Sequence, residues 1–109
     1  MATLSEGVYW IRSRYSGKVL DLSGDSSEDG ARVIDFAQRA PAINTTHNQL
    51  WLVELTPSRK SYTIRNADTG TIIDLSGGNA NDDTPIIGWT DHGTSNQMWR
   101  IEWVTDYDR

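Results

Sequence analysis

Residues 17–24 read Gly-Lys-Val-Leu-Asp-Leu-Ser-Gly, and the pattern returns at residues 70–77 as Gly-Thr-Ile-Ile-Asp-Leu-Ser-Gly. Each copy is followed by an Asn-Gln-x-Trp sequence, at residues 48–51 and 96–99. A repeat that only built a core would need the apolar pattern alone, yet the Asp, Asn and Gln also stand at matching places. The sequence therefore predicts one unit present twice, with a polar site in each copy.

The alternation of short apolar runs with clusters of turn-forming residues predicts an all-β fold. Short apolar, aromatic and β-branched runs alternate with clusters of Gly, Ser, Asn and Asp, which is typical of a sandwich or barrel. Eight runs are expected to be strands: residues 8–12, 19–22, 33–36, 51–54, 62–65, 72–75, 86–89 and 99–103. They divide into two four-stranded repeats, at about residues 6–55 and 60–104. The short stretch between them predicts that the copies pack on each other.

Length and composition exclude several classes of protein. A chain of 109 residues is expected to form a single domain over residues 1–109. Fifteen acidic and ten basic residues give a net charge of −5 without a basic cluster, so a nucleic-acid partner is not expected. We also expect no membrane insertion, because no apolar run is long enough to span a bilayer. The start of the chain lacks a signal-peptide pattern, which predicts a cytoplasmic protein, with any release by a non-classical route.

The distance between two residue types is the same in both copies. Fifteen positions separate Asp21 from Phe36, and fifteen separate Asp74 from Trp89. Eleven residues then precede the Asn-Gln pair in the first copy and six in the second, so the variation lies in one loop. A carboxylate, a flat aromatic face and an amide in one surface hollow suit a sugar, because hydroxyls need hydrogen bonds and the pyranose has an apolar face.

These motifs together resemble the repeat of the ricin B-type lectins, a β-trefoil family with a Gln-x-Trp signature. The resemblance extends from about residue 6 to residue 103, and the second copy is especially similar to mushroom and other fungal lectins. It implies a carbohydrate-binding lectin for glycans bearing galactose or N-acetylgalactosamine. In the second copy the implied binding residues are Asp74, Trp89, Asn96, Gln97 and His92. In the first copy they are Asp21, Phe36, Asn48, Gln49 and His47.

The resemblance also implies a role for each residue type. The aspartates accept hydroxyl hydrogen bonds, the aromatics stack on the sugar, and the asparagines supply a second polar contact. Gln49 and Gln97 would brace the aspartates, and Trp51 and Trp99 would enter the core. Phe36 offers a smaller face than the usual Trp, so the first site is expected to be the weaker one.

Other interpretations of these residues stay open from sequence alone. The aspartates could be turn formers, Phe36 could belong to the core, and both histidines could be solvated loop residues. The acidic stretch 25–30 lacks the alternating ligands of a calcium loop, so neither a metal nor a cofactor is expected.

The number of repeats is the main departure from the family. A β-trefoil has three, and this chain supplies two, which predicts open strand edges and an incomplete trefoil or one completed by an oligomer. We expect a homo-oligomer, with a dimer favoured, that makes shallow sugar sites multivalent. Trp10 and Trp103 are candidates for this interface or for ordinary core.

Two other classes of function compete with the lectin. An enzyme is not expected, because the paired carboxylates fall in separate copies and no Ser/His or Cys/His set is present. A trefoil-type protease inhibitor or protein-interaction module would instead act through its loops, chiefly residues 37–47.

Overall fold

The computed structural model describes residues 4–39 and 47–102. The strands are β1 Gly7–Tyr9, β2 Val19–Leu22, β3 Ala31–Phe36, β4 Trp51–Leu55, β5 Tyr62–Asn66, β6 Ile72–Leu75 and β7 Ile86–Trp89. Three short 3₁₀ turns accompany them: η1 Ser23–Asp25, η2 Ser76–Gly78 and η3 Ser95–Gln97. The described part of the chain has no α-helix, so the predicted all-β class is confirmed. None of its helical segments has the length and apolar character needed to cross a membrane.

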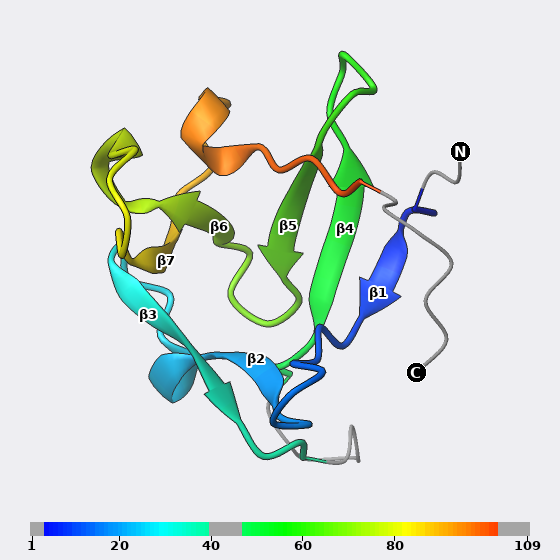
Figure 1. The fold of residues 1–109 in the computed structure, drawn as a ribbon, viewed down its shortest axis with the longest axis vertical. Helices are drawn as coiled ribbons and strands as arrows, with labels where there is room; N and C mark the ends of the chain where they lie inside the picture. The colour runs from blue at the N-terminus through cyan, green and yellow to red at the C-terminus, as the bar shows by residue number, and fades with distance from the viewer. Residues whose placement is uncertain (1–3, 40–46, 103–109) are drawn as a thin grey trace.

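The strands form one antiparallel sheet in the order β1-β4-β5-β6-β7-β3-β2. Figure 1 shows this sheet curled around a central space, like a ring that is not closed. The β2–β3 and β6–β7 hairpins meet where Ala31 pairs with Gly88. The long β4–β5 pair joins the first copy to the second. The copies therefore share one sheet, as the short connection between them predicted.

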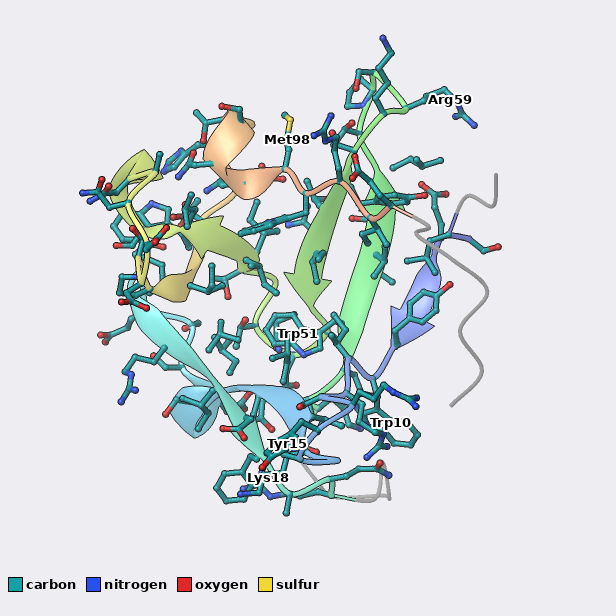
Figure 2. All side chains as sticks on the ribbon, viewed as in Figure 1. Trp10, Tyr15, Lys18, Trp51, Arg59 and Met98 are labelled. Carbon is teal, nitrogen blue, oxygen red and sulfur yellow. The ribbon has the colours of Figure 1, made fainter. Side chains whose placement is uncertain are left out.

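Both copies contribute to the core inside the ring. Leu22 and Trp51 from the first copy form a buried cluster with Ile64 and Ile73 from the second. Figure 2 shows Trp51 in the middle of the ring and Trp10 toward its edge. Burial of these side chains is the main stabilising contribution, since apolar area removed from water is worth about 25 cal/mol per Å².

The two signature tryptophans differ in burial. Trp51 is fully buried and its indole N–H donates to the Leu20 carbonyl at 3.1 Å. Trp99 is half-buried and donates to the Ile73 carbonyl at 3.2 Å. Trp10 is 38% exposed, so it is not a core residue, and Trp103 lies outside the described residues.

The eighth expected strand, at residues 99–103, is not a strand over its described residues, 99–102. A single bridge pairs Trp99 with Tyr62 at the start of β5. The equivalent β4 has a neighbour on each side, β1 and β5. Residues 99–102 have β5 on one side and, in the described part of the chain, no strand on the other. The prediction was wrong because an apolar run becomes a strand only where it finds partners for its backbone.

β1 forms the other open edge of the ring. β1 pairs with β4 alone, and the described residues place no strand on its outer side. The fold is thus an incomplete trefoil, with the position of a third repeat open between β1 and Trp99.

Candidate functional site

Two hollows occupy matching places in the two copies. The first has a volume of about 330 Å³ and is lined by Asp21, Ser23, Gly24, Asp25, Ile34, Phe36, Arg39 and Asn48. The second has a volume of about 260 Å³ and is lined by Asp74, Gly77, Trp89, His92, Thr94, Asn96 and Gln97. We call them the first site and the second site.

Strand register explains why fifteen residues separate the aspartate from the aromatic. Asp21 pairs with Ile34 across the β2–β3 hairpin, and Phe36 lies two residues beyond Ile34. Residues two apart on a strand point to the same face, so Phe36 and Asp21 face the same hollow. The β6–β7 hairpin repeats this, with Asp74 opposite Ile87 and Trp89 two residues further.

Each hairpin turns through a glycine in the left-handed region. Gly24 has a φ of 68° and Gly77 a φ of 63°, in the 3₁₀ turns η1 and η2 that follow each aspartate. A side chain is strained at such φ values, so glycine favours this turn. The turn brings its own residues to the rim of each hollow.

In the first site, a glutamine and an asparagine brace a buried carboxylate. Asp21 is buried, and its Oδ1 accepts a hydrogen bond from Asn48 Nδ2 at 3.1 Å. Its Oδ2 accepts one from Gln49 Nε2 at 3.1 Å. Gln49 also donates to the Ala37 carbonyl at 2.9 Å and accepts from the Arg39 backbone N–H at 2.8 Å. The glutamine thus fixes both the carboxylate and the strand that carries Phe36.

The second site repeats the glutamine part of this arrangement. Gln97 Nε2 donates to Asp74 Oδ2 at 2.9 Å and to the Thr90 carbonyl at 2.8 Å. Gln97 Oε1 accepts from the His92 backbone N–H at 2.8 Å. Asp74, Thr90 and His92 each lie 53 positions after their counterparts Asp21, Ala37 and Arg39.

The asparagines contact the turns that follow the aspartates. Asn48 Nδ2 donates to the Leu22 carbonyl at 3.0 Å, and Asn96 Nδ2 donates to the Leu75 carbonyl at 3.2 Å. Asn96 Oδ1 also accepts from Thr94 Oγ1 at 2.6 Å. Both asparagines therefore line their hollows beside the aspartates.

The structure gives the surroundings of the aspartates and of the two aromatic residues. Asp21 accepts hydrogen bonds from Asn48 and Gln49, and Asp74 accepts one from Gln97. Phe36 is 42% exposed and lines the first hollow, so it is not a core residue. Trp89 is half-buried in the lining of the second.

The two histidines do not occupy equivalent places. His92 lines the second site, whereas His47 is exposed and is not among the lining residues of the first. His47 directly precedes Asn48, so its counterpart in the second copy is Ser95. The longer loop of the first copy separates His47 from the position that His92 occupies.

Arg39 is the site residue that sequence reasoning missed. It lines the first hollow at the position that His92 holds in the second, 53 residues earlier. Arg39 Nη1 lies 3.3 Å from Asp21 Oδ2, and its Cζ lies 4.7 Å from the centroid of the Phe36 ring. The constant offset between the copies was the signal that could have identified Arg39.

A third hollow, of about 350 Å³, lies beside the β4–β5 pair. Arg65 joins Glu54 and Asp91 there at 3.4 and 2.9 Å, and its guanidinium lowers the pKa of Asp91 through a hydrogen bond. The lining contains no aromatic face. It therefore lacks the arrangement that the two other sites share.

The two buried aspartates of the repeats lie in different sites. Asp21 and Asp74 line separate hollows, and Asp25 is a second carboxylate in the lining of the first. Within residues 4–39 and 47–102, no group of three His, Cys, Asp or Glu residues could hold a metal ion. Of the loop at 37–47 that could serve a protease inhibitor, residues 40–46 lie outside the described residues.

With this geometry established, comparison with known proteins identifies the class. The chain belongs to the ricin-type β-trefoil lectin domain-like family, which it matches over residues 47–108. The fold and the family together define a lectin-type carbohydrate-binding domain. A comparison with curated proteins found no match.

Solved structures share this fold. A designed three-fold symmetric protein, ThreeFoil, is 28% identical with a TM-score of 0.77, over 90% of this chain and 66% of that one. A Polyporus squamosus lectin, bound to the epitope Neu5Acα2-6Galβ1-4GlcNAc, is 34% identical with a TM-score of 0.79, over 94% of this chain. An exo-β-1,3-galactanase from Clostridium thermocellum is 28% identical with a TM-score of 0.79, also over 94% of this chain.

The chain spans only part of these proteins. It covers about two thirds of ThreeFoil, 35% of the Polyporus lectin chain and 21% of the galactanase chain. The similarity therefore concerns the repeat domain and not the rest of those proteins.

Proposed function

We propose that this protein is a lectin for glycans bearing galactose or N-acetylgalactosamine, with Asp74, Trp89 and Asn96 forming its stronger site. The observation that carries the proposal is the brace that recurs at both aspartates, with each aspartate facing an aromatic ring. A buried carboxylate that is held in place but still reaches a surface hollow is suited to accept hydroxyl hydrogen bonds.

The second site has the groups that a neutral sugar needs. Within the described residues, Asp74 accepts one side-chain hydrogen bond, from Gln97 to Oδ2, so lone pairs remain for hydroxyl groups. Trp89 would stack on the apolar face of the pyranose, and Asn96 would bond a further hydroxyl. His92, which lines the same hollow, would add a contact at the rim.

The first site would be weaker for such sugars. Phe36 presents a smaller ring than Trp89, and Asp21 already accepts hydrogen bonds on both oxygens. Asn48 and Gln49 correspond to Asn96 and Gln97, while the exposed His47 would reach a ligand only beyond the hollow.

We further propose that the protein acts as a homo-oligomer, with a dimer favoured. Single sugar sites bind at about millimolar affinity, and linking them raises the apparent affinity about 10²-fold or more. The open edges at β1 and Trp99 support this, because a second copy could pair with them. Sedimentation equilibrium over a range of protein concentrations tests this: a monomer throughout contradicts it.

Titration of the protein with galactose, N-acetylgalactosamine and glucose tests the proposed function. We expect the first two to shift NMR signals of Trp89 and His92 and glucose to have little effect. Asp74→Ala should abolish these shifts, while Asp82→Ala, on an exposed turn, should leave them unchanged. Saturable binding that survives Asp74→Ala, or no binding to any galactoside by folded protein, contradicts the proposal.

A further inference from the structure

The first site is already occupied by a side chain of the protein itself. The Arg39 guanidinium lies over the Phe36 ring, with 4.7 Å between Cζ and the ring centroid, which is within the range of cation–π contacts. Its Nη1 reaches Asp21 Oδ2 at 3.3 Å. Arg39 thus contacts the two groups that a neutral sugar would use for stacking and for hydrogen bonding.

We propose that Arg39 makes the first site selective for acidic saccharides, those carrying a carboxylate or a sulfate, while the second site takes neutral ones. This inference rests on the proposed lectin function. A neutral sugar must displace the guanidinium and offers it nothing in exchange. A saccharide with an anionic group also displaces the guanidinium from Asp21, but its anionic group then forms an ion pair with the guanidinium.

The bond that such a ligand must replace is a weak one. Charge-assisted N–H···O bonds are normally about 2.7–2.9 Å long, and the Arg39–Asp21 contact is 3.3 Å. The Arg39 side chain is 45% exposed, whereas Asp21 is almost completely buried. Loss of Arg39 also leaves Asp21 with the hydrogen bonds from Asn48 and Gln49. The carboxylate therefore stays satisfied when Arg39 moves to a ligand.

The guanidinium has donors to spare. Of its five N–H groups, one makes the contact with Asp21, and the side chain makes no other hydrogen bond within the described residues. A planar fork of donors matches the two oxygens of a carboxylate or a sulfate. Asp25 is the second acidic group in this hollow beside Asp21, and burial, with a hydrogen bond that its protonated form donates to Asp68, raises the pKa of Asp25 to about 6. Its negative charge therefore weakens below that pH.

The second site provides an internal reference. His92 replaces Arg39 there, and the described residues place no cation over the Trp89 ring. The overall charge of −5 disfavours anionic ligands wherever no local cation compensates. We therefore expect the first site to prefer acidic sugars and the second site to prefer neutral ones, although a glutamine holds the aspartate in both.

A site-resolved NMR titration at pH 7 tests the inference. The ligands are galactose, galacturonic acid, galactose 3-sulfate and galactose 6-sulfate, and the backbone amides of Arg39 and His92 report on the two sites. At the first site we expect at least one acidic sugar to bind about tenfold more tightly than galactose, as one charge-assisted contact allows. The carboxylate and sulfate arms show which anion is preferred. At the second site galactose should bind more tightly than the acidic sugars.

Two matched variants isolate the guanidinium. Arg39→Gln should remove the acidic preference and improve galactose binding at the first site, because the Phe36 face is uncovered. His92→Arg should introduce an acidic preference at the second site. The inference is overturned if wild-type protein shows no acidic preference at the first site, or if Arg39→Gln retains it. If galactose binds at the second site but the first site shows no preference for acidic sugars, this inference alone is wrong. If no saccharide binds at either site, the proposed function is wrong.

Discussion

The two copies of the repeat hold their buried aspartates in the same way but present different side chains to the hollow. In each, a buried aspartate is bonded to a glutamine that is also tied to the backbone after the aromatic residue. The groups that face the hollow differ: Phe36 and Arg39 in the first copy stand where Trp89 and His92 stand in the second. The comparison separates what builds a site from what selects its ligand.

There is a physical reason why both copies have a glutamine that donates to the buried aspartate. A carboxylate almost excluded from water costs several kcal/mol unless donors satisfy it, so both copies need the glutamine wherever they place the aspartate. Side chains at the rim carry no such requirement. They can therefore change the ligand without changing the fold.

Removing the signature tryptophans should break the symmetry of the copies most strongly. Trp51→Ala empties the centre of the core and should cost about 3–5 kcal/mol in the free energy of unfolding. Trp99→Ala should cost less, because Trp99 is half-buried and has one neighbouring strand. Urea denaturation measures both values. If Trp51→Ala does not fold, Trp51→Phe against Trp99→Phe gives the same ranking. Equal losses would show that the open edge does not loosen the second copy.

Replacing each glutamine by leucine should separate the two braces. Gln97→Leu removes the one side-chain donor that Asp74 has among the described residues and should cost about 2 kcal/mol. Gln49→Leu should cost about 1 kcal/mol less, because Asp21 keeps its bonds to Asn48 and Arg39. Urea denaturation at pH 7 compares the variants, with Lys60→Leu on the exposed turn between β4 and β5 as the control. A larger loss for Gln49→Leu would contradict this account of the aspartates.

Exchanging the aromatic platforms should sharpen the comparison further. Phe36→Trp alone should hardly improve galactose binding at the first site, because Arg39 still covers the ring. Phe36→Trp combined with Arg39→His gives the first site the aromatic and rim residues of the second. The galactose affinity of the altered first site should then lie within about threefold of that of the second site, a difference below 1 kcal/mol. Calorimetric titration of variants that also carry Asp74→Ala reports on the first site alone. Full improvement from Phe36→Trp alone would show that Arg39 does not obstruct the platform.

The sequence predicted what depends on local pattern. Alternation and turn residues identified seven strands, and the fifteen-residue spacing indicated which aspartate and aromatic residue line the same hollow. The eighth strand was not predicted correctly, because residues 99–102 lack a second neighbour, and neighbours are a property of the whole sheet. Arg39 was missed because its role comes from lying over Phe36 and against Asp21, which the chain brings together only through the hairpin.

The smallest expected difference concerns the turns after the aspartates. Asp25 and Gly78 hold equivalent positions, 53 residues apart, with φ values of 52° and 63°. Burial and the hydrogen bond that protonated Asp25 donates to Asp68 raise the pKa of Asp25 to about 6, and its Oδ1 is buried without a partner among the described residues. The ionised carboxylate is therefore disfavoured in the folded protein.

The sign of the pH dependence follows from that raised pKa. Between about pH 4 and pH 6 the folded state holds a proton that the unfolded state releases, so this group lowers the free energy of unfolding as the pH rises. Asp25→Asn removes the titration and tolerates the positive φ, so it should flatten this slope and stabilise the protein at pH 7. The gain should stay below about 1 kcal/mol because solvent screens a partly exposed group. Thermal unfolding from pH 4 to 7 measures it, and Asp25→Gly, which copies Gly78, should show the same loss of slope. An unchanged slope in both variants would mean that water at the rim of the first site already satisfies Asp25.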